Sequence, residues 1–157
     1  MVIVYGFEDC ALSKMYYLLK PVLVKSGQFM KERIRILVGF DGSLQSKKAL
    51  KEAIIIAQHF SGYIKVVNVY KKGKKKEAEA TILEAEQSLN QEKVAHDSLY
   101  TLCDNPAETL VIMAKQENFE LIVLGSRGLG RKVSILIGSV SKQVVSNAYC
   151  NVLVIKK

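Results

Sequence analysis

The chain has 157 residues, of which 49% are hydrophobic and 24% charged, and its formal net charge is +8 at pH 7. This length is enough for one domain with a substantial core, and the composition is that of a globular protein rather than a disordered chain. No apolar run reaches the roughly 20 residues of a membrane span, and the start lacks the basic region and cleavage site of a signal peptide. We therefore expect a cytoplasmic protein without a membrane partner.

Residues 1–29 have the least regular pattern and are predicted to be an N-terminal extension of a domain that spans residues 30–157. Met1–Tyr5 is compatible with a short strand. The apolar residues of Cys10–Leu19 are compatible with an amphipathic turn or two, which Pro21 would end or kink. These apolar residues must pack either on the domain or on a second subunit, and the sequence indicates no function for them.

From residue 34 onward, strand-like apolar runs alternate with helical patterns, and no hairpin signal separates them. The first strand leads through a turn to a helix with Ser43 as its N-cap, and Asn105-Pro106 marks another helix start. This alternation predicts a parallel sheet with right-handed crossovers and helices on both faces. The strands are expected at Ile34–Val38, Tyr63–Tyr70, within Ala95–Cys103, at Leu121–Leu124 and at Val152–Ile155, and the later helices at Glu77–Gln91, after Asn105 and at Gly138–Ala148.

Five lysines gather in the segment Lys71–Lys76, interrupted by Gly73. A run of this kind between two periodic segments is typical of a solvated loop. The alternative is an electrostatic rim that draws polyphosphates toward a pocket. Aromatic residues do not interleave with the lysines and no nucleic-acid fold signature is present, so a nucleic-acid partner is disfavoured.

The apolar run Leu121–Leu124 stops at a glycine-rich turn that leads into the last helix. Gly125 and Gly128 allow a sharp bend and the close approach of a ligand. The first amides of the helix carry the positive end of its dipole, which favours a phosphate. The order of the glycines fails the dinucleotide fingerprint, and the P-loop pattern fails because Arg131 and Lys132 stand where a lysine and a metal-binding hydroxyl are needed.

The spacing Gly125-x2-Gly128-x9-Gly138-Ser139 resembles the nucleotide-binding signature of the universal stress protein family, in its ATP-binding branch. The resemblance runs from about Ile34 to Ile155. It implies a three-layer α/β/α domain of the adenine nucleotide α-hydrolase-like type, with a five-stranded parallel sheet in the order 3-2-1-4-5. It also implies a regulatory stress-response protein that binds ATP, with ADP or AMP as alternatives and Mg or Mn as a companion ion. A homodimer through the last strand and an unidentified protein partner are expected as well.

In such a sheet the ligand lies beyond the carboxyl ends of strands one and four, where the strand order reverses. By the resemblance, Asp41 bonds the adenine or ribose, Gly39 lets the base approach, and the backbone of Val69 meets the adenine. The alternatives are an Asx turn at Asp41 and a core position for Val69. The other expected contacts, to the ribose and phosphates, come from Gly125, Ser126, Arg127, Gly128, Arg131, Gly138, Ser139, Val140 and Ser141.

No catalytic constellation accompanies this crevice in the sequence. His59 and His96 fall on the first helix and the third strand, and Asp41 is the one carboxylate expected nearby. Without a general base or a water-orienting residue, binding is favoured over fast phosphoryl transfer. The alternatives are a weak ATPase or a phosphotransferase that autophosphorylates at Ser139 or Ser141, and an interaction module for which nucleotide is incidental. No metal ligand is predicted, because no metal-binding spacing links Cys10, Cys103 and Cys150.

The binding hypothesis makes a specific claim about two glycines. Replacing Gly125 or Gly128 by valine is expected to abolish the effect of ATP on thermal melting. The same substitutions are expected to leave the fold intact.

Overall fold

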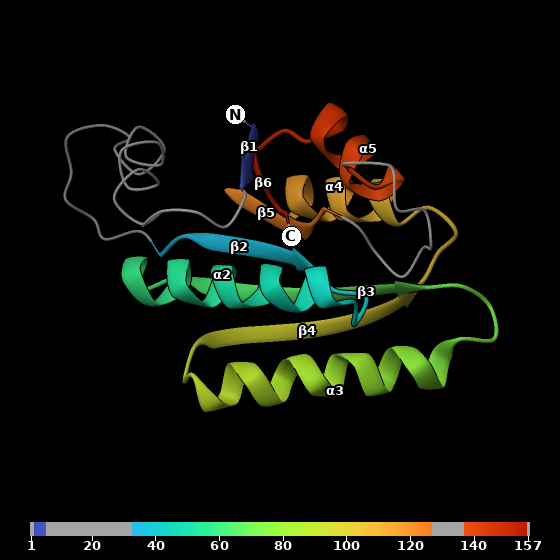
Figure 1. Cartoon of the computed structure of the whole chain (residues 1–157), viewed down its shortest axis with the longest axis horizontal. Coiled ribbons are helices and arrows are strands. Elements are labelled where there is room, and N and C mark those ends of the chain that lie inside the picture. The colour runs from blue at the N-terminus through green and yellow to red at the C-terminus, as the bar shows by residue number, and fades with distance from the viewer. Residues whose placement is uncertain (1, 6–32, 127–136, 157) are drawn as a thin grey trace.

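The computed structural model describes residues 2–5, 33–126 and 137–156 (Figure 1). They form a six-stranded, all-parallel sheet in the order β1-β6-β5-β2-β3-β4. Strands β2 to β6 reproduce the predicted order 3-2-1-4-5, and β1 is added outside β6. The strands are β1 (Val2–Tyr5), β2 (Arg35–Gly39), β3 (Tyr63–Tyr70), β4 (Ala95–Leu102), β5 (Leu121–Gly125) and β6 (Asn151–Ile155), and the helices are α2 (Leu44–Phe60), α3 (Lys75–Gln91), α4 (Pro106–Gln116) and α5 (Ser139–Asn147).

Of the described helices, α2 and α3 pack on one face of the sheet and α4 and α5 on the other, which confirms the three-layer α/β/α prediction (Figure 1). Ile36 and Val38 of β2 pack with residues of α2 and α3 in one core cluster, whereas Leu37 between them packs with α4 and α5 in the other. This alternation follows from the two-residue period of a strand. Every residue of β5 is buried, as expected for a strand covered on both faces.

The helix starts follow the capping residues seen in the sequence. The Ser43 hydroxyl accepts a hydrogen bond from the backbone N–H of Ser46 at 3.2 Å, and the Asn105 side chain accepts one from the N–H of Glu108 at 3.3 Å. Each bond satisfies an amide that has no partner within its helix. None of the described helices combines the length and the apolarity that crossing a bilayer requires.

β1 lies along the outer edge of β6, and this pairing changes one prediction. Val2 to Tyr5 stand opposite Val152 to Ile155, residue for residue and in parallel. The implied order 3-2-1-4-5 makes Val152–Ile155 an edge strand, and in the structure β1 takes the edge position instead. The expected homodimer through Val152–Ile155 stays a prediction. The boundary at residues 29 and 30 also stays a proposal, since β1 belongs to the same sheet as the domain.

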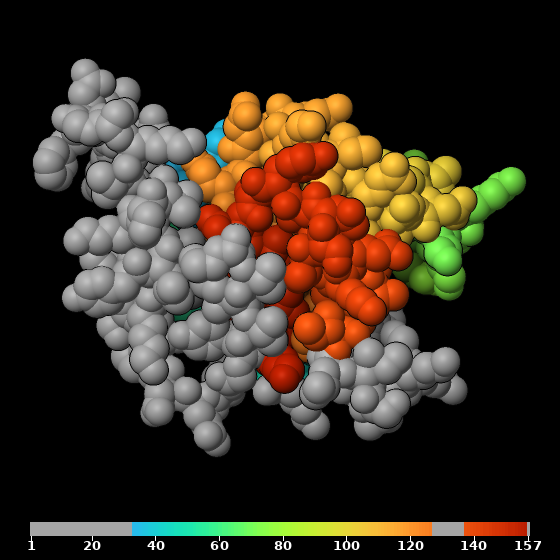
Figure 2. Space-filling view, turned by 90° about the horizontal axis from the view of Figure 1, so that it is seen from above, coloured from blue at the N-terminus to red at the C-terminus, as the bar shows by residue number. Residues whose placement is uncertain are grey.

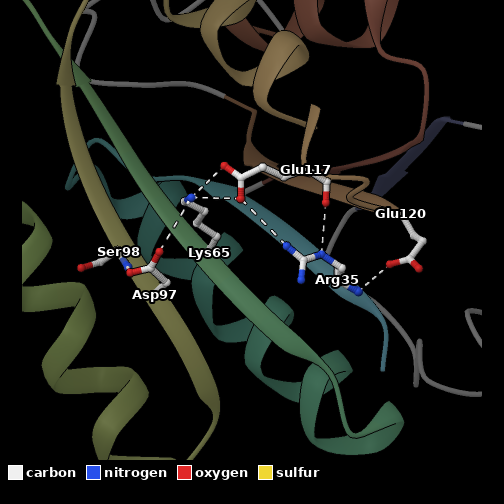
Figure 3. A network of polar contacts seen from close by, with 6 residues as sticks. All are labelled: Arg35, Lys65, Asp97, Ser98, Glu117 and Glu120. Atoms are coloured by element: carbon white, nitrogen blue, oxygen red, sulfur yellow. Dashed lines mark hydrogen bonds and ion pairs between the residues drawn. The ribbon is translucent and has the colours of Figure 1, made fainter. Parts of the chain in front are cut away.

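A charged network lies near the amino ends of β2, β3 and β4, at the opposite end of the sheet from the expected ligand crevice (Figure 3). The ammonium group of Lys65 donates to both carboxylate oxygens of Glu117, at 2.8 and 3.0 Å, and lies 3.7 Å from Asp97. The Arg35 guanidinium carbon lies 5.0 Å from the centroid of the Tyr63 ring. Burial lowers the pKa of Lys65, but the Glu117 and Asp97 carboxylates outweigh burial and hold this pKa above its usual value.

This network predicts how stability depends on alkaline pH. A lysine with a higher pKa in the folded chain stabilises the fold while it is charged, and this contribution is lost as the pH rises through the folded-state pKa. Replacing Lys65 by methionine should lower the free energy of unfolding by about 1–2 kcal/mol at neutral pH. The difference in unfolding free energy between the wild type and this variant should shrink above about pH 10.4. Urea unfolding of the wild type and the variant, from neutral pH to about pH 11, measures this difference.

A matched control is Lys47→Met. The Lys47 ammonium lies 2.6 Å from Glu84, but both side chains are more than 40% exposed, whereas the Lys65 side chain is 13% exposed. Solvent therefore weakens the Lys47 pair, and its loss should cost at most about 0.5 kcal/mol. Equal losses in the two variants would show that the Lys65 network adds nothing beyond a surface ion pair.

Candidate functional site

The two strand ends from which the site is expected to form, those of β2 and β5, lie side by side. These strands are neighbours, with Gly39 of β2 opposite Leu124 of β5. After β2 the chain enters α2 on one face of the sheet, and α5, on the other face, precedes β6. The strand order reverses between β2 and β5, as the implied sheet order requires, and ligands of such sheets bind at this switch point. A ligand crevice at this point stays a prediction.

Hydrogen bonds to β3 fix the turn that follows β2. The backbone N–H of Phe40 donates to the carbonyl of Val67 at 2.9 Å, and the Asn68 side-chain amide donates to the Phe40 carbonyl at 2.8 Å. Asn68 and Phe40 are both buried. Sequence reasoning missed Asn68, although asparagine is depleted in strands and its presence among valines was a usable signal.

Asp41 forms an Asx turn at this point. Its carboxylate Oδ1 accepts a hydrogen bond from the backbone N–H of Ser43 at 3.0 Å, and Gly42 follows with a φ of +77°. That φ lies in the left-handed region, which glycine adopts without steric cost. The turn sets the direction of α2 and leaves the Asp41 side chain half-buried at the crevice. Asp41 therefore has an observed role in the turn, and its contact with a ligand stays a prediction.

The end of β5 is held tightly between α2 and β6. A Cβ atom on Gly125 would lie 2.7 Å from the carbonyl carbon of Gln45 and 2.8 Å from the backbone nitrogen of Ser46. The next residue, Ser126, is 3% exposed, and its N–H donates to the Ile155 carbonyl at 2.7 Å. Close packing of α2 against β5 therefore accounts for glycine at position 125. At Gly39 the nearest atoms are those of the Leu124 side chain, 2.5 Å from an added Cβ.

The start of α5 lacks a side-chain cap. Its N-cap is Gly138, with φ −70° and ψ 164°, and among the described residues no side chain caps the first turn. The Gly138 N–H donates to the Ser126 carbonyl at 2.6 Å, which ties this helix start to the end of β5. The first backbone N–H groups of a helix have no partner within it and carry the positive end of its dipole. Such a terminus suits an anion. Figure 2 shows α5 at the surface of the molecule.

One of the two hydroxyls expected to contact the ligand already has a partner. The Ser141 hydroxyl donates to the carbonyl of Gly125 at 2.8 Å, and Ser141 is 5% exposed. This bond joins the first turn of α5 to the last residue of β5. Ser139 is exposed at the first position of the helix. The structure therefore assigns Ser141 a role in holding α5 in place.

The predicted site residues divide into four groups. Gly39, Asp41, Gly125 and Ser126 lie at the ends of β2 and β5, and Gly138, Ser139, Val140 and Ser141 form the start of α5. Val69 lies on β3, the other neighbour of β2, half-buried against the core cluster of α4 and α5. Arg127, Gly128 and Arg131 lie outside the described residues.

The two histidines lie far from this crevice, as the sequence suggested. His59 is near the far end of α2, 16 residues beyond Ser43, which corresponds to about 24 Å of helix. His96 is the second residue of β4, at the amino end of that strand, and its Nδ1 lies 2.7 Å from the Val94 carbonyl. Within the described parts of the chain, no group of three or more His, Cys, Asp or Glu side chains is arranged to hold a metal ion.

A cavity of about 560 Å³ lies elsewhere, between α4 and the end of α5. Its lining includes Ile112, Lys115 and Tyr149, and the Lys115 ammonium lies 4.3 Å from the centroid of the Tyr149 ring. α4 runs antiparallel to the strands, so its second half faces away from the carboxyl ends of β2 and β5. This cavity is therefore not part of the crevice.

Comparisons with known proteins agree with this fold. The family model described as "Universal stress protein family" matches residues 33–156. Universal stress protein MJ0531 of Methanocaldococcus jannaschii is 30% identical over 162 residues, covering 93% of this chain and 94% of that protein. A Thermus aquaticus protein, "Universal stress protein in QAH/OAS sulfhydrylase 3'region", is 33% identical over 133 residues, covering 77% of this chain and 97% of its own length.

Solved structures of similar fold include two that contain nucleotides. The universal stress protein of Archaeoglobus fulgidus in complex with dAMP has a TM-score of 0.66 and 21% identity, and the match covers 81% of this chain and 100% of that one. A universal stress protein family protein of Arabidopsis thaliana with AMP bound has a TM-score of 0.60 and 18% identity. The match covers 79% of this chain and 92% of that one. At these identities the similarity shows the fold.

Proposed function

Since the chain belongs to the universal stress protein family, we propose that it is a regulatory protein of the stress response that binds an adenine nucleotide at the carboxyl ends of β2 and β5. ATP is the proposed ligand, with ADP or AMP as alternatives, and the cytoplasm is the proposed compartment. The observation that carries the proposal is the start of α5, which no side chain of the described residues caps and which the Gly138–Ser126 bond ties to the end of β5.

The electrostatics of the crevice favour a phosphate. The start of α5 presents amides and the positive end of a helix dipole, and the Asp41 carboxylate stands at the turn after β2. A carboxylate beside a phosphate would repel it, so the two features suit different parts of one ligand. We assign the phosphates to α5 and the sugar or base, which offer hydroxyl or amino donors, to Asp41. The AMP and dAMP held by the two neighbours of similar fold offer both parts.

In this proposal the protein binds nucleotide without fast turnover. Among the described residues of the crevice, Asp41 is the one side chain of a type that can act as a general base, and its Oδ1 already accepts the Ser43 N–H. Slow hydrolysis of bound ATP, with Mg²⁺ or Mn²⁺ carried on its phosphates, remains compatible with this site. Autophosphorylation favours Ser139 over Ser141, since Ser141 is buried and its hydroxyl is bonded to Gly125.

The proposal is tested by the effect of nucleotide on thermal unfolding. A ligand that binds only the folded chain adds about 1.4 kcal/mol at ten times its Kd. For a domain of this size the melting temperature should rise by about 3–6 °C. Differential scanning calorimetry with ATP, ADP, AMP and GTP measures this rise and ranks the ligands. GTP is the control, because it carries the same phosphates on a different base. A rise of equal size with all four would indicate a phosphate site without adenine recognition, and no rise at millimolar ATP would overturn the proposal.

A further inference from the structure

The lysine segment, Lys71–Lys76, connects β3 to α3 and enters the first turn of that helix. All of its residues are exposed, and a Cβ atom added to Gly73 would have no atom within 4 Å. Figure 1 shows the turn between β3 and α3 at the periphery of the molecule, beyond the end of β3. The sequence left two roles open for this segment, a solvated loop and an electrostatic rim.

Most of the positive charge of the lysine segment is not neutralised by the described residues. Lys74 pairs with Glu77 at 2.6 Å, and the Lys75 ammonium lies 3.9 Å from the Glu79 carboxylate. The side chains of both pairs are exposed, so solvent weakens these pairs. The lysines of the segment that form no ion pair with a described residue are Lys71, Lys72 and Lys76.

The lysines are unfavourable for the helix that they begin. Lys74 is the N-cap of α3 and makes no capping hydrogen bond with its side chain, and Lys75 and Lys76 are the first two residues of the helix. A helix start carries the positive end of the dipole, so a cation there destabilises the helix. The stability of α3 therefore does not explain these lysines. Residues that break a local rule of this kind are expected mainly at functional positions.

The lysine segment stands at the end of the sheet where the nucleotide is proposed to bind. β3 is a neighbour of β2, and Gly39, the last residue of β2, stands opposite Val67. β3 continues to Tyr70, so Lys71 lies about 13 Å beyond the end of β2 at the usual rise of a strand. A ligand that approaches the carboxyl ends of the strands therefore comes within the electrostatic field of the lysines.

We propose that the lysine segment is an electrostatic rim that selects adenine nucleotides by their charge, so that ATP binds in preference to AMP. This inference rests on the function proposed above and adds the property by which the site ranks its ligands. Each further phosphate adds negative charge, so the rim attracts ATP more strongly than AMP and leaves uncharged adenosine unaffected. Asp104 and Glu108, which follow β4 at the same end of the sheet, offset part of this field.

The rim acts at a distance, since the phosphates are assigned to the start of α5. Its contribution therefore depends on salt, which screens charges over about 8 Å at physiological ionic strength. A direct contact between a lysine and a bound phosphate would resist screening. Salt dependence thus separates the rim from a binding contact.

The test removes two unmatched charges with the double substitution Lys72→Gln and Lys76→Gln. Isothermal titration calorimetry gives the Kd of ATP, AMP and adenosine without magnesium, at about 0.02 M and about 0.5 M salt, where the screening lengths are roughly 20 and 4 Å. At the lower salt concentration the Kd of ATP should rise about three- to fivefold, that of AMP by less than about twofold, and that of adenosine should stay unchanged. At the higher salt concentration all three should match the wild type.

The matched control is Lys93→Gln with Lys115→Gln. It removes the same number of charges at the opposite end of the sheet, where Lys93 precedes β4 and Lys115 lies in the last turn of α4. This control should bind ATP as the wild type does. Urea unfolding should show that the variant with Lys72→Gln and Lys76→Gln is at least as stable as the wild type, because Lys76 opposes the dipole of α3. If that variant does not fold, Lys72→Gln alone, which lies outside α3, is measured in the same way.

The outcomes separate this inference from the proposed function. If the wild type binds ATP but the variant and its control bind ATP equally, the rim proposal is overturned and nucleotide binding stands. A loss of ATP affinity that persists at about 0.5 M salt, or that extends to adenosine, would also overturn the rim. A wild type that binds none of the three compounds would overturn the proposed function, and the rim with it.

Discussion

Replacing Gly125 by alanine is expected to lower the free energy of unfolding by about 3 kcal/mol. The added Cβ would lie 2.7 Å from the carbonyl carbon and the Cβ of Gln45 and 2.8 Å from the backbone nitrogen of Ser46. Two of these three atoms belong to the backbone of α2, which cannot rotate aside as a side chain does. Overpacking of this kind typically costs 1–3 kcal/mol, and more where the surroundings are rigid. Urea unfolding followed by circular dichroism measures the change.

Gly73→Ala is the matched control. Gly73 has a φ of +85°, and no atom lies within 4 Å of an added Cβ. This substitution should cost the strain of a left-handed backbone alone, about 1–2 kcal/mol. A smaller loss at Gly125 than at Gly73 would mean that α2 moves away from β5 freely, and that the two turns of the crevice are not rigidly joined.

This packing also changes how glycine substitutions test nucleotide binding. Valine at Gly125 brings the same Cβ and two further methyl groups, so the structure argues against the expectation that Gly125→Val leaves the fold intact. A loss of ligand response in that variant would follow from loss of the folded state alone. Gly128 lies outside the described residues, and for Gly128→Val the original expectation stands.

Local sequence signals predicted most of the fold. The helix caps at Ser43 and Asn105, the apolar strands and the alternation of strand with helix all depend on residues close together in the chain. The pairing of β1 with β6 depends on residues at opposite ends of the chain. Val2–Tyr5 was recognisable as a strand, but an apolar run does not specify which distant strand it joins. The implied strand order therefore ended at β6, where the structure adds β1.

At the candidate site, the sequence predicted the position and missed the supporting contacts. The sequence placed Asp41 and Gly125 at the ends of two neighbouring strands, where the strand order reverses, and the structure has them there. The bond from Asn68 to Phe40, the contact of Gly125 with Gln45 and the bond from Ser141 to Gly125 each join residues from different elements. Glycine and serine at these positions resembled ligand contacts, since packing and ligand binding favour the same small residues.

Replacing Ser139 by proline is expected to weaken nucleotide binding about 10- to 100-fold and to leave the fold unchanged. Ser139 is the first residue of α5, where proline is favoured because its fixed φ suits the helix and its missing N–H has no helical partner. The preceding residue, Gly138, already has the extended conformation that a following proline requires. The substitution therefore removes one amide donor from the crevice. A hydrogen bond to a charged group contributes about 1.5–3 kcal/mol, which sets the expected loss.

Ser139→Ala separates the backbone from the side chain at this position. Alanine removes the hydroxyl and keeps the N–H, so it should bind nucleotide within about threefold of the wild type if the amide holds the phosphate. Isothermal titration calorimetry gives the three dissociation constants, and unfolding without ligand shows whether all three proteins are equally stable. If proline binds as tightly as serine, the start of α5 does not hold the phosphate. If alanine weakens binding as much as proline, the contact comes from the hydroxyl, and the uncapped helix start is not the basis of recognition.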